Sequence, residues 1–125
     1  MKLTKYVATA CIALAITSCG SKTTTSETTK ATTQTVDGIT TSTFKVWGNC
    51  EMCKETIEGS LKVDGVTKAD WNKESKIITI AYDDKKITLD QIQKNIALVG
   101  YDNEKYKGND SAYNELPGCC QYDRK

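Results

Sequence analysis

Two thiols stand three positions apart in the segment Trp47-Gly-Asn-Cys50-Glu-Met-Cys53. The chain has six cysteines and no histidine, so thiolate is its only strong soft ligand. Thiolates select soft ions such as Cu(I), whereas Mg²⁺ and Ca²⁺ prefer oxygen. Cys50 and Cys53, called the cysteine pair below, are therefore predicted to bind a soft metal ion.

Two thiolate ligands favour some soft ions over others but do not identify a single ion. Two thiolates can span the two-coordinate geometry of Cu(I) or Hg(II), whereas structural Zn(II) normally takes four ligands. We expect Cu(I) first, with Hg(II), Zn(II) and Cd(II) as alternatives. The same spacing is also typical of a thiol–disulfide oxidoreductase, a redox sensor or a small disulfide. A thioredoxin-like enzyme usually has a cis-proline strand, but the chain's one proline, Pro117, lies near its end.

The elements that must position the pair lie in residues 43–107, which carry the strong hydrophobic periodicity. Alternation predicts strands at 43–47, 66–71, 77–82 and 102–106, and helical spacing predicts helices at 50–62 and 89–99. Asn49 is the expected N-cap of the first helix, and Thr88-Leu-Asp-Gln91 is a capping box. The order β-α-β-β-α-β predicts an α+β, ferredoxin-like sandwich, with a four-stranded antiparallel sheet and two helices on one face.

This topology places Cys50 and Cys53 at the start of the first helix, on one rim with residues 72–75 and with Gly100 and Tyr101. The positive end of a helix dipole and its free N–H groups favour a thiolate. The predicted layout is therefore a cysteine pair at one end of a small domain.

These residues resemble the heavy-metal-associated domain of copper chaperones, copper-pump amino-terminal modules and periplasmic mercury-binding proteins. The likeness covers residues 43–107 and rests on four stretches: the opening succession of strand, loop, CxxC and helix, then Asp64-Gly-Val66, Ala81-Tyr-Asp83 and Val99-Gly-Tyr-Asp102. It implies that Cys50 and Cys53 are the metal ligands and that Tyr101 lies beside them. Met52, which stands between the two cysteines, is also expected near the metal. It also implies transfer of the ion to a metal efflux pump or to another CxxC or Met-rich envelope protein.

One stretch departs from the family pattern. Members usually have Gly-Met and one further residue before the first cysteine, and the Met fills the core beneath the loop. Here these positions are Trp47, Gly48 and Asn49. We expect Trp47 to supply the apolar plug and Asn49 to lie near the metal.

Residues 108–125 are a polar, turn-rich tail that contains Cys119 and Cys120. From the far end of the last predicted strand, the 13 residues from Tyr106 to Cys119 could extend roughly 40 Å, beyond a domain height of about 25 Å. The tail can therefore bring a third or fourth thiolate to the pair, with Tyr113 and Leu116-Pro117 as anchors. A separate site and a disulfide stay open as alternatives.

The first residues predict export. Residues 1–18 have a basic head and a short apolar run, as in a secretory signal, and Ser18-Cys19-Gly20 resembles a bacterial lipobox with Cys19 as the lipidated residue. An ordinary secreted signal is the alternative. Residues 19–42, rich in Thr and Ser, are predicted to be a disordered tether. The expected protein is a lipid-anchored envelope protein whose domain lies outside the cytoplasm.

Charge and composition exclude other classes. Without residues 1–18, 15 basic and 16 acidic residues leave a formal charge of −1, with no basic stripe for nucleic acid. Without histidine no Ser-His-Asp triad is possible, and no phosphate-binding Gly-rich loop is present. We therefore expect a metal carrier and not an enzyme.

Overall fold

The structure is a computed structural model that describes residues 31–124. The predicted signal segment, Cys19 and residues 19–30 of the predicted tether lie outside the described residues. The strands are β1 (Thr32–Val36), β2 (Ile39–Lys45), β3 (Val66–Trp71) and β4 (Ile77–Tyr82). The helices are α1 (Glu51–Gly59), α2 (Leu89–Leu98), α3 (Asp110–Glu115) and the short 3-10 turn η1 (Gly118–Cys120). Between residues 31 and 124 no helix is long and apolar enough to cross a membrane.

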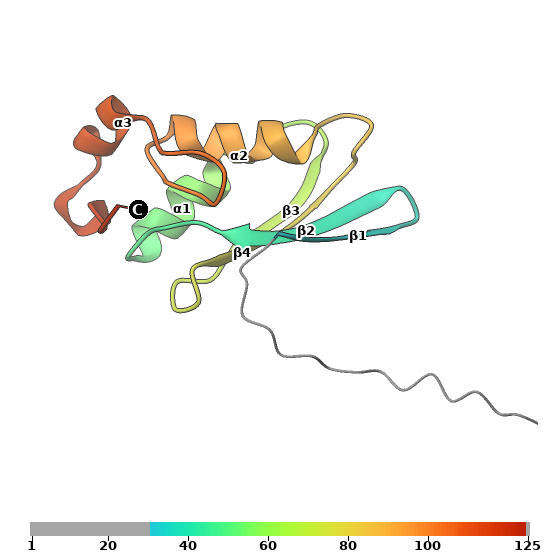
Figure 1. Ribbon diagram of the computed structural model, residues 1–125, viewed down its shortest axis with the longest axis horizontal. Coiled ribbons are helices and arrows are strands. Elements are labelled where there is room, and N and C mark those ends of the chain that lie inside the picture. The colour runs from blue at the N-terminus through green and yellow to red at the C-terminus, as the bar shows by residue number, and fades with distance from the viewer. Residues whose placement is uncertain (1–30, 125) are drawn as a thin grey trace, which may run out of the picture.

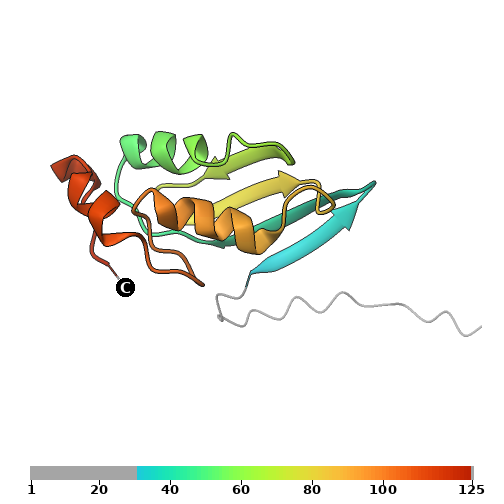
Figure 2. The ribbon, with the colours of Figure 1, turned by 90° about the horizontal axis from the view of Figure 1, so that it is seen from above.

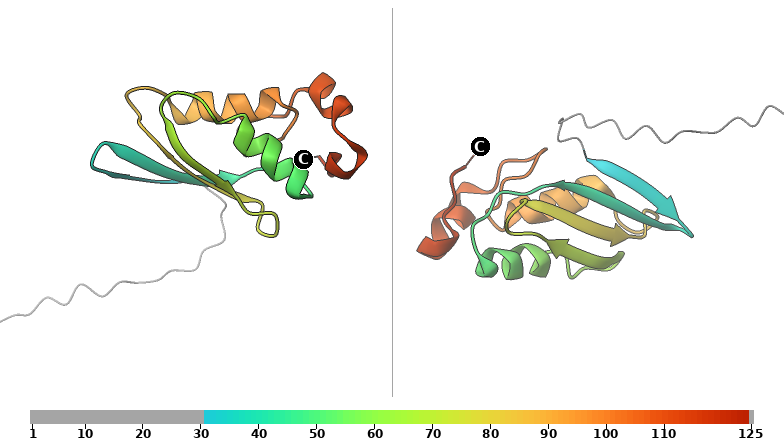
Figure 3. Two further views of the ribbon diagram at one scale, coloured as in Figure 1. Left: turned by 180° about the vertical axis from the view of Figure 1, so that it is seen from behind. Right: turned by 90° about the horizontal axis from the view of Figure 1, so that it is seen from below.

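The strands form one antiparallel sheet in the order β1-β2-β4-β3. Helices α1 and α2 lie side by side on one face of this sheet (Figures 1 and 2). This arrangement confirms the predicted α+β, ferredoxin-like fold class. Helix α3 and η1 lie at one end of the sandwich, beside the start of α1 (Figure 3). That end is called the site end below.

Strand β1 corrects the prediction of a disordered tether, because residues 32–42 form β1 and the first half of β2. Asp37 and Gly38 join the two strands with positive φ values of 51° and 79°, as a two-residue hairpin turn requires. Although β1 has no hydrophobic face, hydroxyl pairs join it to β2. Thr33 bonds Ser42 and Thr35 bonds Thr40, each at 2.9 Å between side-chain oxygens. Cross-strand hydroxyl pairs of this kind stabilise a polar hairpin.

The strand predicted at 102–106 is wrong. Only the isolated bridge between Val46 and Asn103 forms there. Strand β1 already pairs with residues 39–43 of β2, and the later segment reaches only the remainder of that edge. There Glu104 N donates to Lys45 O at 3.2 Å and Trp47 N donates to Asp102 O at 2.9 Å. The chain then turns back toward the site end.

The other elements follow their sequence signals closely, except that the strand predicted at 43–47 is the second half of β2 and ends at Lys45. Strands β3 and β4 have the predicted bounds, and both reciprocal hydrogen bonds of the Thr88–Gln91 capping box form at the start of α2. The regular part of α1 stops at Gly59, earlier than predicted, and residues 60–62 form a turn. Even so, Leu61 is buried with Ile57 against the sheet. These short elements therefore position the cysteine pair on a packed core.

Candidate metal centre

The cysteine pair lies at the start of α1, as predicted. Cys50, and not Asn49, is the N-cap residue, because its backbone is extended and α1 begins at the next residue. The Cys53 sulfur is fully buried and accepts hydrogen bonds from Asn49 N at 3.3 Å and Cys50 N at 3.4 Å. The two sulfur atoms lie 3.4 Å apart. These backbone donors can support a negatively charged or metal-bound sulfur at the helix start.

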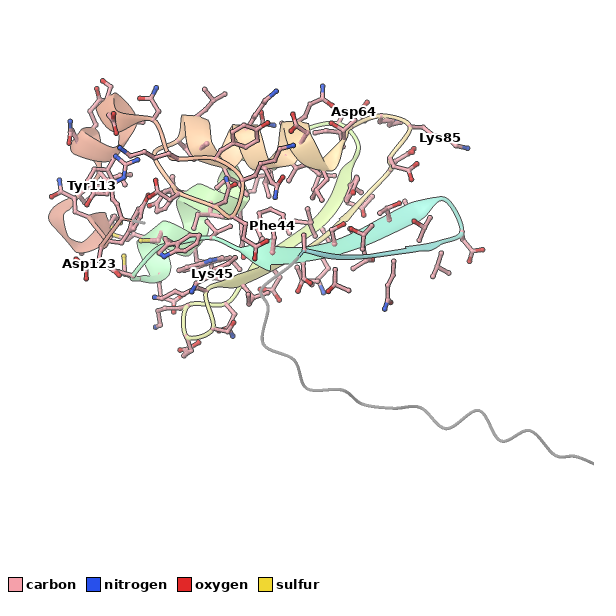
Figure 4. The ribbon with its side chains drawn as sticks, in the orientation of Figure 1. Phe44, Lys45, Asp64, Lys85, Tyr113 and Asp123 are labelled. Atoms are coloured by element: carbon pink, nitrogen blue, oxygen red, sulfur yellow. The ribbon has the colours of Figure 1, made fainter. Side chains whose placement is uncertain are left out.

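The structure brings the tail cysteines to the pair. Cys120 is 1% exposed, and its sulfur lies 3.4 Å from that of Cys50. Cys119 is exposed on the rim, with its sulfur 3.9 Å from that of Cys120. In Figure 4 the yellow sulfur atoms gather at the site end, near the labelled Asp123. All four cysteines of residues 31–124 are free thiols.

The tail takes a shorter route than the sequence suggested. With no final strand, it does not need to cross the length of the domain. Gly108 instead packs against Gly100 at the end of α2, where a Cβ on Gly108 would lie 2.6 Å from the Gly100 carbonyl carbon. This close approach requires a glycine. The tail therefore starts beside the site end and needs only α3 and η1 to reach Cys50.

Aromatic packing holds the tail in place. Tyr122 is buried and stacks on Tyr101, with ring centroids 5.6 Å apart. The Tyr122 hydroxyl donates to Gly100 O at 2.8 Å and accepts from Asp102 N at 2.6 Å. Tyr113 meets the same ring edge-on at 5.2 Å and donates its hydroxyl to Tyr122 O at 2.7 Å. The predicted anchor Tyr113 is confirmed, whereas the larger anchor, Tyr122, was missed.

An ion pair next to the aromatic stack was also missed. Asp102 is fully buried, and Arg124 Nη2 donates to its Oδ1 at 2.8 Å. Gly108 N donates to the same oxygen at 2.7 Å. The Asp102 carboxylate raises the pKa of Arg124 above its ordinary value. The guanidinium also bonds Asp110 at 2.6 Å and lies 4.6 Å from the Tyr113 ring. The ion pair between Asp102 and Arg124 thus ties the end of the tail to the segment that follows α2.

Tyr101 lies beside the thiols, as the resemblance implied. Its ring is fully buried, and its hydroxyl has no hydrogen-bond partner among the described residues. Burial is the main cause that raises the pKa of Tyr101, and nearby Cys53 and Cys120 add to it. Burial likewise raises the pKa of the Cys120 thiol, with Cys50 and Cys53 adding to the shift. This shift favours the protonated thiol, whereas a bound cation favours the thiolate and releases the proton.

The plug beneath the loop is Trp71, and not Trp47 as predicted. A Cβ on Gly48 would meet the Trp71 ring at 3.0 Å, so the ring from β3 fills the space under the loop. Trp71 also donates its indole N–H to Val46 O at 3.1 Å. Trp47 is only half-buried, and Lys45 Nζ lies 5.0 Å from its ring centroid.

The remaining predicted neighbours contact the tail. Asn49 Nδ2 donates to Gln121 O at 3.3 Å, so its side chain joins the loop to the tail. The Met52 sulfur lies 3.7 Å from the Cys119 sulfur, and both side chains are exposed. The sulfur atoms thus form a buried floor of Cys53 and Cys120 and an open rim of Met52 and Cys119, with Cys50 between them.

Comparisons with known proteins also indicate a metal-binding domain. A family model described as "Heavy-metal-associated domain" matches residues 43–102. Copper chaperone CopZ of Staphylococcus aureus (strain JH9) is 40% identical over 55 residues, which are 43% of this chain and 81% of that protein. The same values hold for CopZ of strain Newman.

Two solved structures are also similar. One is a CopZ metallochaperone, 37% identical, with a TM-score of 0.49 over 50% of this chain and 97% of that chain. The other is the N-terminal domain of a potential copper-translocating P-type ATPase from Bacillus subtilis, in the Cu(I)-loaded state. It is 26% identical, with a TM-score of 0.49, over 58% of this chain and 92% of that chain. The family match contains the cysteine pair and Tyr101, whereas β1, Cys119 and Cys120 lie outside it.

Proposed function

Because this chain belongs to the heavy-metal-associated domain family, we propose that it binds Cu(I) through Cys50 and Cys53 and passes the ion to a partner by ligand exchange. The observation that carries the proposal is the cysteine pair itself. Its two thiols lie 3.4 Å apart at a helix start, with backbone N–H groups directed at the inner sulfur. The similarity to a copper chaperone of Staphylococcus aureus supports Cu(I) over Hg(II), Zn(II) or Cd(II).

Unequal burial of the two thiols supports an ordered exchange. Cys50 is half-buried and faces the rim, whereas Cys53 is fully buried beneath it. A partner thiolate reaches an ion on Cys50 first, and Cys53 is the last ligand to leave. Each step exchanges one thiolate for another and transfers no electron, as expected of a metal carrier. The partner is a protein that presents soft ligands, such as the CxxC domain of a metal efflux pump.

The transfer rate tests the proposal. Cu(I)-loaded protein is mixed without oxygen with an isolated CxxC domain from a copper-translocating ATPase, and movement of the ion is followed by separation of the two proteins. We expect the rate to rise with acceptor concentration, because exchange requires direct contact of the two proteins. An acceptor with both cysteines replaced by serine is the control. A rate that does not depend on the acceptor indicates release into solution and contradicts the proposal.

We also propose that the protein is anchored to a membrane of the bacterial envelope through lipid on Cys19. The support is the basic head, the short apolar run and Ser18-Cys19-Gly20. Cell fractionation of the Cys19→Ser variant tests this: the variant is expected in the soluble or unprocessed fraction, and the parent in the membrane fraction. A processed Cys19→Ser protein that stays with the membrane would falsify the anchor.

A further inference from the structure

Three sulfur atoms at the site end form a compact set without Cys53. The sulfurs of Cys50, Cys119 and Cys120 all lie within 4.8 Å of one another. For any three atoms so spaced, some point lies within about 2.8 Å of all three, close to the ~2.3 Å of a metal–thiolate bond such as Zn–S. Cys53 lies 3.4 Å from Cys50 but is not a member of this set.

We propose that Cys50, Cys119 and Cys120 form a second soft-metal site, a three-thiolate site that uses Cys50 in common with the cysteine pair. The inference rests on the proposed function in that Cu(I) is the ion to be held. Binding would release the protons of the three thiols and transfer no electron. Three thiolates enclose Cu(I) more completely than two, so this site would hold the ion and the open pair would release it.

The tail is built so that these ligands are held in place before the ion arrives. Tyr122 follows Cys120 by two residues and is fixed by stacking on Tyr101 and by its bonds to Gly100 and Asp102. Asn49 bonds the intervening Gln121, which holds the loop of Cys50 against the tail. Such anchoring lowers the conformational entropy that is lost when the site closes around an ion.

The rim supplies a further soft atom. The Met52 sulfur lies 3.7 Å from the Cys119 sulfur on the exposed side of the set. Thioethers are soft ligands for Cu(I). Met52 is thus placed where an ion enters, whereas Cys120 lies on the buried floor. Cys50 contacts ligands of both sites and can keep hold of the ion as it moves from one to the other.

Two matched variants separate the sites. Cys53→Ser keeps the three-thiolate set, and the double variant Cys119→Ser, Cys120→Ser keeps the pair. Each is loaded with one equivalent of Cu(I), and X-ray absorption counts the sulfur neighbours. We expect about three sulfurs in the parent and in Cys53→Ser, and about two in the double variant. Against a Cu(I) chelator, Cys53→Ser should release the ion more slowly than the double variant.

The outcomes distinguish this inference from the proposed function. A parent that shows the same two-sulfur coordination as the double variant overturns the three-thiolate site and leaves the pair intact. A double variant that cannot bind Cu(I), beside a Cys53→Ser variant that can, overturns the pair and leaves the new site standing. Replacement of the buried Cys53 by serine can disturb folding. Circular dichroism therefore checks that the variant folds, and Cys53→Ala serves as a second variant. If neither folds, a parent with two-sulfur coordination still overturns the site, and a Cys119→Ser variant that loses one sulfur neighbour relative to the parent supports it.

Discussion

Replacement of Cys50 by serine is expected to abolish tight Cu(I) binding, with a loss of affinity on the order of 10²–10⁴-fold, the range lost when linked ligands no longer act together. The Cys50 sulfur lies 3.4 Å from Cys53 on one side and 3.4 Å from Cys120 on the other. It therefore belongs to both proposed ligand sets, and serine supplies only a hard oxygen in its place. Competition with a Cu(I) chelator of known affinity measures the loss.

Cys119→Ser is the matched control for this prediction. It also removes one thiol from the site end, but Cys119 lies on the exposed rim and belongs to only one of the two sets. Its effect on affinity should be much smaller than that of Cys50→Ser. Equal losses for the two variants, or an unchanged affinity in Cys50→Ser, would show that Cys50 is not the shared ligand.

Replacement of Tyr122 by alanine is expected to lower the free energy of unfolding by about 3 kcal/mol, as for other large aromatic-to-alanine changes in a core. The ring is 3% exposed and packs between Tyr101 and Tyr113. Its loss leaves a cavity and removes the hydroxyl that bonds Gly100 and Asp102. Urea denaturation of the reduced, metal-free protein measures the change. The same variant should release Cu(I) faster, because Cys120 loses its anchor.

Tyr122→Phe separates packing from hydrogen bonding at this position. It keeps the stacked ring and removes only the hydroxyl, so we expect a loss of about 1 kcal/mol. If alanine and phenylalanine have equal effects, the stack contributes little and the anchor is the hydroxyl alone. If neither changes stability, the tail is not packed on the domain in solution.

The parts of the fold that the sequence predicted well have strong local signals. The reciprocal capping box fixed the start of α2, and alternating Ile residues gave the bounds of β4. The position of the cysteine pair followed from a strand, a break and a helical pattern in direct succession. In each case the residues that carry the signal also make the contacts, so local and tertiary preferences agree.

The parts that were missed depend on partners distant in the sequence. A Thr-rich segment lacks a hydrophobic face, and only the hydroxyl pairs with β2 show why β1 is ordered. Asp37-Gly38 was the available signal, since this dipeptide favours a tight hairpin. Tyr122 and Arg124 gave no periodic signal, because each is held by residues at the end of α2 that precede it by about 20 positions. The length of the tail predicted that Cys119 and Cys120 could reach the cysteine pair, but it did not predict which contacts would hold the tail there.

The position of β1 has a consequence for the order in which the chain folds. Residues 34 and 41 pair across a two-residue turn, whereas Glu104 meets Lys45 across 59 residues. A hairpin forms in about 1–10 μs, and closing a longer loop costs more entropy. The β1–β2 hairpin is therefore expected to form before residues 102–104 reach β2, so that β1 already covers the first half of that edge. On this order of events, the early hairpin leaves the later segment only the end of β2 and directs it, with Cys119 and Cys120, to the site end.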